Sequence, residues 1–327
     1  MVKYILKRLG LSVLILLGVS LILYILIRIM PVNFVQDIVN KMGSGGTTIP
    51  QETVDILYEM YGLSDGSFWG IIKGYFTWLW SLLRFDLGTS FKYGVPVVDD
   101  IVTYSGVSFI VAFIAIIFEY MIAIPLGVTA ATHQYSIRDY VVTILVVIGI
   151  SMPSFFFAQI MKDLFAMKLG WFPPATLRDE TSTLPAFIDY AWHLVLPVST
   201  IVILSIGGTM RYTRTNMLEV LNADYIRTAR AKGLKESKVI YKHAFRNTMI
   251  PIVTMLAGVL PSLFSGAMIL EQVFGIPGIG NRALQAMLAG DIPYIMGYNM
   301  FLAFLSVIGV LLSDIMYVVV DPRVKLA

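Results

Sequence analysis

Ionisable side chains inside long apolar runs are the first candidates for chemistry in this sequence, because a charge placed in lipid is costly and is often retained for function. Glu119 interrupts one such run near its middle, and Asp163 follows Lys162 at the end of another. A carboxylate at these places would line a polar path through the membrane or pair with a base on a neighbouring helix. We take Glu119 and Asp163 as candidate pathway residues, with structural pairing as the alternative.

Catalytic and metal chemistry have no comparable set of residues. The sequence has no cysteine, which excludes thiolate nucleophiles, thiolate metal sites and disulfides. Its histidines, His133, His193 and His243, are far apart and predict no ligand cluster. It also has no Gly-x-x-x-x-Gly-Lys-Ser/Thr stretch to hold nucleotide phosphates. We predict no catalytic residue, metal or cofactor in this chain, and no binding of nucleic acid.

A basic segment with helical pattern lies between two of the apolar runs. It reads Asp224-Tyr-Ile-Arg-Thr-Ala-Arg-Ala-Lys-Gly-Leu234. The residues spaced to form one apolar helix face are Leu218, Leu221, Tyr225 and Ala229. Gly233 suits the left-handed backbone that ends a helix, and a second helix is predicted from about Lys235 to Asn247. A solvated loop would explain the charge but not the pattern, so we predict a docking surface.

Composition decides which elements must position these residues. The chain has 327 residues, of which 57% are hydrophobic and only 14% charged, whereas about 25% are charged in a soluble domain. This is an integral membrane protein. Backbone polar groups in lipid must be satisfied internally, and the apolar runs are too continuous for alternating barrel strands, so we predict an all-α fold.

Six runs reach the roughly 18 residues that are needed to cross a bilayer. They are Leu9–Ile27, Ile101–Gln134, Tyr140–Met161, Tyr190–Met210, Asn247–Leu270 and Ile292–Ser313, the last continuing to Val320. The first is longer than the apolar core of a signal peptide, so we interpret it as a retained helix rather than a cleaved leader. Pro153 and Pro197 predict kinks in the third and fourth runs, and Pro251 is expected to open the fifth.

Orientation follows from the loops. Placing the N-terminus inside puts most of the 24 lysines and arginines on the cytoplasmic side and leaves the acidic segment 31–100 outside. We therefore predict an N-in/C-in chain with three parts. Residues 1–30 form the N-terminus and first helix, residues 31–100 an extracytoplasmic segment, and residues 101–327 a five-helix core with a cytoplasmic region at 211–249.

The extracytoplasmic segment has three predicted parts. Met42–Pro50 is rich in glycine and predicts a flexible turn. Gln51–Tyr61 has the spacing of a short amphipathic helix. Phe68–Leu83 carries three tryptophans and suits a position at the membrane interface, with a seventh span as the alternative.

Four stretches in this order resemble the permease subunits of ABC importers, specifically the oligopeptide/dipeptide/nickel branch. They are Asp86-Leu-Gly-Thr-Ser90, the segment from Glu219 to Leu234 followed by His243-Ala-Phe-Arg-Asn-Thr-Met-Ile-Pro251, Glu271-Gln-Val-Phe-Gly-Ile-Pro-Gly-Ile-Gly280, and Asp314-Ile-Met-Tyr-Val-Val-Val-Asp-Pro-Arg323. Arg227-Thr-Ala229 replaces the Glu-Ala-Ala-like triplet of other importers, as is typical of the peptide branch. Phe85 stands where glycine is common.

The resemblance implies a type I importer fold and a set of partners. Two permeases pair, two cytoplasmic ATPases that carry ATP and Mg²⁺ each hold one coupling helix, and an extracytoplasmic peptide-binding protein delivers the substrate. The implied ATPase-coupling residues are Glu219, Asp224, Tyr225, Arg227, Thr228, Ala229, Arg230, Ala231, Lys232, Gly233 and Leu234. Tyr225 and Leu234 would be apolar anchors, and the basic residues polar contacts. The implied outer loop beside the binding protein contains Gly275, Pro277, Gly278 and Gly280.

Other functions remain as alternatives. The same architecture could import nickel or a nickel chelate, although no ligand cluster favours this. A secondary transporter would predict inverted repeats and paired broken helices, and no such self-similarity is evident. An intramembrane protease would need a nucleophile or metal site in the runs. We expect a multi-pass protein of a prokaryotic cell membrane that imports oligopeptides or dipeptides.

Overall fold

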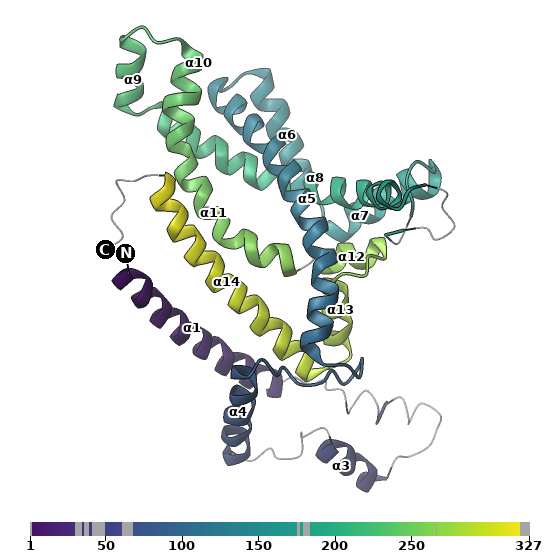
Figure 1. The fold of residues 1–327 in the computed structure, drawn as a ribbon. Helices are drawn as coiled ribbons and strands as arrows, with labels where there is room; N and C mark the ends of the chain where they lie inside the picture. Colours follow the sequence, from purple (N-terminus) through teal and green to yellow (C-terminus); the bar gives the residue numbers. More distant parts are fainter. Residues whose placement is uncertain are drawn as a thin grey trace.

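The computed structural model describes residues 2–29, 35, 39–40, 50–60, 68–174, 177–178, 184–265 and 267–320. Over these residues the regular structure is helical, apart from an isolated bridge between Thr89 and Pro96. The prediction of an all-α protein is confirmed for this part of the chain. Figure 1 shows the long helices side by side, with shorter helices at both ends of the bundle.

Four described helices are long and apolar enough to cross a membrane. They are α1 (Val2–Ile29), α5 (Val97–Thr132), α8 (Ala186–Leu221) and α14 (Ile292–Val320). They correspond to the first, second, fourth and sixth predicted runs. Helix α8 contains Pro197 without a break and continues well past Met210, where its apolar run ends. Hydropathy thus located the part of α8 suited to lipid but not its end.

The extension of α8 is held by polar and apolar contacts. Arg214 donates two hydrogen bonds of 2.9 Å to the carboxylate of Asp139, which lies on α6 (Ile137–Ser151), a helix packed against α8. Met217 is fully buried. A helix can therefore extend beyond its apolar run when neighbouring elements bind the polar side chains and bury the apolar side chains of the added residues.

The third predicted run is not one continuous helix. It divides into α6 and α7 (Ser154–Met161), and α7 continues as a π-helix, η1 (Lys162–Lys168). Met152 between them is extended, with φ −92° and ψ 137°. Pro153 causes the break because its ring disfavours helical backbone at the preceding residue and it cannot donate a backbone hydrogen bond. The kink predicted at Pro153 in the run Tyr140–Met161 is therefore a complete break between two helices.

The fifth predicted run is also broken. It contains α11 (Arg246–Ser265) and α12 (Met268–Phe274), which are followed by α13 (Ile279–Leu288). Gly258–Phe274 and Ile279–Leu288 meet at 79°, and counting them as one broken span brings the candidate spans in the described residues to five. Pro251 lies inside α11 and does not open it, because the preceding π-helix, η2 (Val239–Phe245), runs directly into α11.

Close packing of α5 against α8 forms the centre of the bundle. A Cβ on Gly127 of α5 would lie 2.7 Å from Cβ of Thr213 and 2.8 Å from the carbonyl oxygen of Met210 on α8. Ala123 and Ala130 on the same stretch of α5 are fully buried. Small residues let two membrane helices approach this closely, so the α5–α8 contact depends on glycine at position 127.

The segment between α1 and α5 contains the two helices predicted for it. These are α3 (Gln51–Met60) and α4 (Phe68–Leu83), whereas the predicted glycine-rich turn at 42–49 lies outside the described residues. Helix α4 is not among the candidate spans, so the seventh-span alternative is not favoured. Tyr75 packs edge-to-face on Tyr24 of α1, with centroids 5.5 Å apart. Trp69 and Trp80 are exposed, as expected of an interfacial helix.

An ion pair joins the first helix to the last. Nε of Arg8 on α1 lies 3.3 Å from Oδ2 of Asp314 on α14. The start of α1 therefore lies beside the end of α14, on the same side of the bundle.

Candidate functional site

The predicted docking segment forms a short helix, α9 (Asp224–Ala231), in a hairpin with α10 (Glu236–Lys238). Between them Gly233 has φ +73°, the left-handed conformation predicted for a helix-ending glycine. The amide of Gly233 donates to the carbonyl of Arg230 at 2.9 Å. The second predicted helix exists as α10, η2 and the start of α11, and not as one α-helix.

The apolar underside of α9 attaches it to the bundle. Ile226 is fully buried and Ala229 nearly so. They pack in one cluster with residues of α5, α8 and η2, namely Val128, Ala131, Met217, Val239 and Ala244. Because its underside is held by three other elements, α9 is a rigid projection of the helix bundle.

The predicted apolar face is wrong in one respect. Tyr225 is 47% exposed, whereas Leu218 and Leu221 belong to the end of α8. Ala223, with φ −71° and ψ 147°, is extended and breaks the helix between them. The break resets the helical register, so Ile226 and Ala229 point inward and Tyr225 points to solvent.

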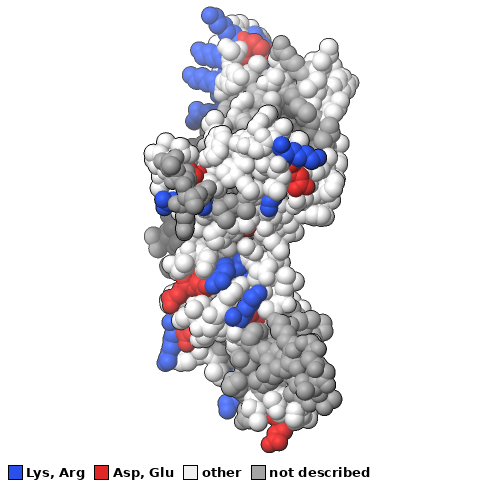
Figure 2. Space-filling model, turned by 90° about the vertical axis from the view of Figure 1, so that its right-hand side faces the viewer, with Lys and Arg blue, Asp and Glu red and all other residues white. Residues whose placement is uncertain are grey.

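The outer face of α9 is polar and exposed. Asp224, Tyr225, Arg227, Thr228 and Lys232 are all exposed. Nη1 of Arg227 lies 3.7 Å from Oδ1 of Asp224, with both side chains largely in solvent. Figure 2 shows lysine and arginine gathered along one edge at the top of the molecule, the end at which Figure 1 places α9 and α10. This face is therefore free to make polar contacts.

Arg230 differs from its basic neighbours. Its Nη2 donates to Oε1 of Glu236 at 2.7 Å, and its Nε lies 3.2 Å from the same oxygen. The hydrogen bond from Arg230 lowers the pKa of the Glu236 carboxyl below its ordinary value. This ion pair crosses the turn at Gly233, so Arg230 ties α9 to α10. Glu219, by contrast, is exposed at the end of α8.

The glycine-rich loop between α12 and α13 encloses a carboxylate. Gly275 has φ +63° and ends α12, and Gly278 precedes α13. A Cβ on Gly278 would lie 2.4 Å from Cδ of Glu271, and one on Gly280 would lie 2.9 Å from Oε2. Both glycines are therefore needed for the backbone to approach Glu271. The stretch with Gly275, Pro277, Gly278 and Gly280 is therefore a turn from α12 into α13 that closes over Glu271.

Glu271 and its partners form a buried polar group, here called the Glu271 cluster. Ser108 of α5 donates to Oε1 at 2.5 Å, and the amide of Asn281 donates to Oε2 at 2.8 Å. The amide of Ile279 donates to the Ser108 hydroxyl at 2.9 Å. The carboxylate and the hydroxyl together satisfy amides at the start of α13, where negative charge is favoured.

The Asp86–Ser90 stretch packs against the same part of the bundle. The Ser90 hydroxyl donates to Oδ2 of Asp291 at 2.5 Å, and the Lys92 amide donates to the same oxygen at 3.0 Å. Asp291 also accepts from the amide of Tyr294 at the start of α14. The loop that encloses Glu271 thus lies at the start of α13, and the Asp86–Ser90 stretch lies near its end.

The side chain of Arg282 supports the packing of the start of α5 against α13. Nη2 of Arg282 on α13 donates to Oδ1 of Asp100 at 2.7 Å, and the Asp100 side chain is only 4% exposed. The guanidinium lies over the rings of Tyr93 and Tyr104, at 3.5 Å and 4.4 Å from their centroids. The pair fixes the start of α5 to α13.

The candidate pathway residues have separate partners. Glu119 accepts a hydrogen bond from Thr209, which joins α5 to α8. Asp163 in η1 accepts from Gln159 at 2.8 Å, one turn earlier. Neither contact involves a base, so the alternative of pairing with a cation has no support in the described residues. Lys162, beside Asp163, donates to the carbonyl of Val273 at 2.7 Å.

The described residues contain no group of three His, Asp or Glu side chains that could hold a metal ion. His193 instead lies beside Asp189, with Nδ1 2.9 Å from the backbone oxygen of that residue.

Comparison with known proteins identifies the family. Residues 123–326 match the family described as binding-protein-dependent transport system inner membrane component. The chain belongs to this family. The match covers α9 as well as the loop that encloses Glu271, so both sites lie within the family's shared region.

Curated relatives extend the match over the whole chain. This membrane component is 35% identical over 326 residues to the oligopeptide transport system permease protein AppB of Bacillus subtilis, covering 99% of this chain and 100% of that protein. It is 32% identical over 327 residues to the dipeptide transport system permease protein DppB of the same organism, covering 100% and 99%. It is 32% identical over 277 residues to the oligopeptide transport system permease protein OppB of Haemophilus influenzae, covering 84% and 86%.

The family resemblance read from the sequence is confirmed. The chain is a multi-pass membrane component of a transport system and not an enzyme. The sequence analysis did not identify four polar residues that bind the elements around α13. They are Ser108, Asp100, Asp291 and Arg282. A signal was available for Glu271, which is the only charged residue between Arg246 and Arg282 in the printed sequence.

Proposed function

We propose that this chain is a permease subunit of an ATP-driven importer of oligopeptides or dipeptides, and that α9 is its coupling helix. The observation that carries the proposal is the two-sided character of α9. Ile226 and Ala229 attach its underside to the bundle, while Tyr225 and Arg227 extend into solvent. A short helix held in this way transmits rigid-body motion to the bundle when a partner moves it.

The proposed partners are a second homologous permease, two cytoplasmic ATPases and an extracytoplasmic peptide-binding protein. The chain has no phosphate-binding loop, so ATP and Mg²⁺ would be held by the ATPases. In α9 and its turn, Asp224, Tyr225, Arg227, Thr228 and Lys232 would contact an ATPase. Ala229 and Arg230 would instead position the helix, since one is buried and the other is bound to Glu236.

The proposed topology has six spans of the type I importer fold, with both termini inside the cell. Helices α6 and α7 would together form the third span, and α11 with α12 the fifth. The Arg8–Asp314 pair supports an even number of crossings, because it places the start of α1 beside the end of α14. The partition at residues 30 and 100, with a cytoplasmic region at 211–249, is part of this proposal.

The proposed outer surface is the loop that encloses Glu271. Gly275, Pro277, Gly278 and Gly280 would face the binding protein. Figure 1 shows α12 and α13, which this loop joins, beside α5 and well away from α9. The Glu271 cluster would keep this loop in shape during transport. Glu119 and Asp163 stay as proposed pathway residues.

Peptide cargo is proposed from the names of the relatives, several of which are oligopeptide or dipeptide permeases over their full length. Nickel cargo is the second candidate of the same architecture. The described residues contain no group of side chains that could hold a bare ion. The names of the relatives favour peptide as the cargo.

The decisive experiment purifies the chain from detergent-solubilised membranes with its accompanying subunits and measures ATP hydrolysis. We expect a second permease and one or two ATPases to co-purify, and hydrolysis to rise when a peptide-loaded binding protein is added. Arg227→Ala and Tyr225→Ala should weaken this stimulation. Lys168→Ala is the matched control, because Lys168 is exposed outside the α9–α10 hairpin. A lone chain that transports substrate without ATP would identify a secondary transporter and contradict the proposal.

A further inference from the structure

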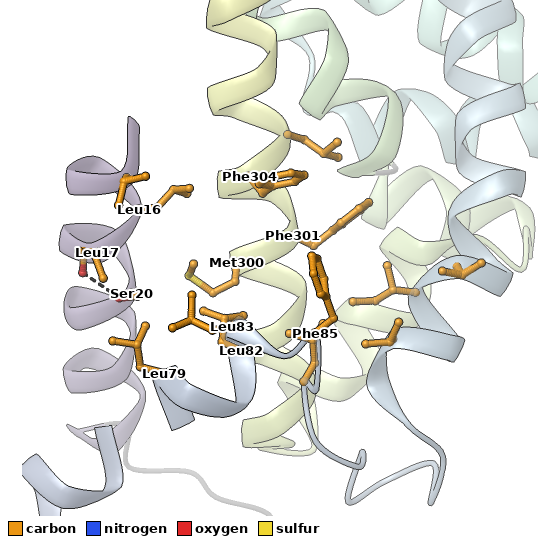
Figure 3. A pocket seen from close by; sticks show the side chains of 16 residues that line it. Leu16, Leu17, Ser20, Leu79, Leu82, Leu83, Phe85, Met300, Phe301 and Phe304 are labelled. Carbon is orange, nitrogen blue, oxygen red and sulfur yellow. Dashed lines mark hydrogen bonds between the residues drawn. The ribbon is translucent and has the colours of Figure 1, made fainter. Parts of the chain in front are cut away.

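A large apolar cavity lies among four helices, away from α9 and from the Glu271 cluster. Its volume is about 480 Å³, and it is bounded by α1, α4, α14 and the start of α5. Figure 3 shows Leu16 and Leu17 of α1 on one side and Met300 and Phe304 of α14 on the other. A cavity of this size is in the range of specific ligand sites, about 300–1,000 Å³.

The lining excludes a polar ligand. Among the described residues that line the cavity, Ser20 alone has a polar side chain, and its hydroxyl is already engaged. It donates to the carbonyl of Leu17 at 2.8 Å and lies 2.9 Å from the hydroxyl of Tyr75. A polar group buried without a hydrogen-bond partner is costly. The lining therefore favours a hydrocarbon chain, which makes no hydrogen bonds.

The position of the cavity indicates where that hydrocarbon comes from. Three of the bounding helices, α1, α5 and α14, are candidate membrane spans. Helix α4 closes the end of the cavity with Leu79, Leu82 and Leu83, and its outer surface carries the exposed Trp80 of an interfacial helix. The cavity is therefore reached from the bilayer, with one end at the level of the lipid headgroups.

A cation is located at that end. Arg84 lies between two lining residues, Leu83 and Phe85, and its guanidinium carbon lies 4.7 Å from the ring centroid of Trp80. No described carboxylate forms an ion pair with it. The nearest acid in sequence, Asp86, accepts a hydrogen bond from the amide of Gly88 at 2.9 Å. The guanidinium therefore offers its donors to an anion, and Arg suits phosphate geometry.

Phe85 closes the same end in an unusual backbone conformation. Its φ is +59°, which is uncommon for a residue with a side chain, and the residue is 83% exposed. In Figure 3 the ring lies beside Phe301 at the boundary of the cavity. The occupant would cover this ring and recover part of the cost of the left-handed backbone.

We propose that this cavity binds an acyl chain of an anionic phospholipid, whose phosphate group pairs with Arg84. The lipid would add contacts among α1, α4 and α14 at the cavity, beside the Arg8–Asp314 pair and the packing of Tyr24 on Tyr75. The proposed site has two parts: the apolar lining binds the acyl chain, and Arg84 binds the negatively charged phosphate group.

The test uses the chain with its accompanying subunits, in nanodiscs that contain phosphatidylglycerol with a photoreactive diazirine in its acyl chain. After irradiation, we expect labelled peptides of this chain to come from α1 around Leu17 and from α14 around Phe301. Unlabelled phosphatidylglycerol should compete better than phosphatidylcholine. Labelling confined to outward residues such as Leu14 would overturn the proposal, as would equal competition by the two lipids.

Paired variants separate the two parts of the site. Leu17→Trp fills the cavity and should abolish the α14 label, while Leu14→Trp, on the exposed surface of the same helix, should leave it unchanged. Arg84→Gln should lower labelling roughly tenfold through loss of the charged hydrogen bonds, while Lys73→Gln on α4 should not. Unchanged labelling in Leu17→Trp would overturn the proposal. A disulfide crosslink from Leu17→Cys, in this chain without other cysteines, to the second permease would show that protein covers the cavity and would overturn the proposal.

Discussion

The region around α9 and the region around α13 differ in whether their polar residues are exposed or buried. Around α13, Glu271, Asp291 and Asp100 are buried, and each is bound by a partner far away in the sequence. On α9 and the turn after it, Asp224, Arg227 and Lys232 are exposed, and only the apolar underside of α9 is held. The polar residues around α13 fix the backbone, whereas those on the outer face of α9 are left in solvent.

This difference separates residues that maintain structure from residues that make contacts. Substitutions around α13 should lower stability first and transport as a consequence. Substitutions on the outer face of α9 should lower coupling while the fold stays intact. Stability and coupled ATP hydrolysis, measured on the same variants, therefore test the comparison directly.

The largest effect is expected for Glu271→Ala. The change leaves the Ser108 hydroxyl and the Asn281 amide without their acceptor in a buried site, which should cost about 3–5 kcal/mol of stability. Thermal unfolding in detergent measures it. Glu219→Ala is the matched control, because Glu219 is exposed. Equal stability of Glu271→Ala and the unaltered protein would mean that the cluster is not structural.

The next effect is expected for Arg282→Met. Asp100 would keep its charge in a nearly closed site without its partner, so we expect a loss of about 2–4 kcal/mol, limited by the partial exposure of Arg282. Adding Asp100→Asn should restore part of the loss, since the unpaired charge is then removed. A double variant whose loss equals the sum of the two single losses would contradict pairing.

Neighbouring residues on α9 provide the sharpest contrast. Ile226→Ala should destabilise the α9–α10 hairpin by about 2–4 kcal/mol, because Ile226 is fully buried. Arg227→Ala should change stability by less than about 0.5 kcal/mol but reduce stimulated ATP hydrolysis. Hydrogen exchange of the hairpin amides and hydrolysis assays measure the two effects. Loss of hairpin protection in Arg227→Ala would remove the distinction between the two faces.

The smallest effect is expected for the exposed Arg230–Glu236 pair, worth about 0.2–1 kcal/mol after solvent screening. Because Arg230 lowers the pKa of Glu236, the contribution is complete above the ordinary glutamate pKa of about 4.3. It is lost as the pH falls through the lowered pKa. Glu236→Gln should remove this acid dependence of hairpin protection, and high salt should weaken the pair at neutral pH. An acid dependence that persists in Glu236→Gln would assign it elsewhere.

Local patterns were sufficient for several features of the permease. The apolar runs located α1, α5, α8 and α14, because a span needs only length and hydropathy. The end of α9 at Gly233 was predicted, because a left-handed residue after a helix favours glycine. The same reasoning failed for Tyr225, because the extended residue Ala223 changes the helical register without a clear sequence signal.

The sequence by itself determined the membrane class, the family and the position of the basic helix α9, because each depends on composition or on residues that are close together in the chain. Only the tertiary structure decided which polar residues are bound and which are free. Glu271 meets Ser108 across 163 positions, and Ser90 meets Asp291 across 201. Such contacts depend on how α5, α13 and α14 pack together, and a periodic pattern along one helix does not contain that information.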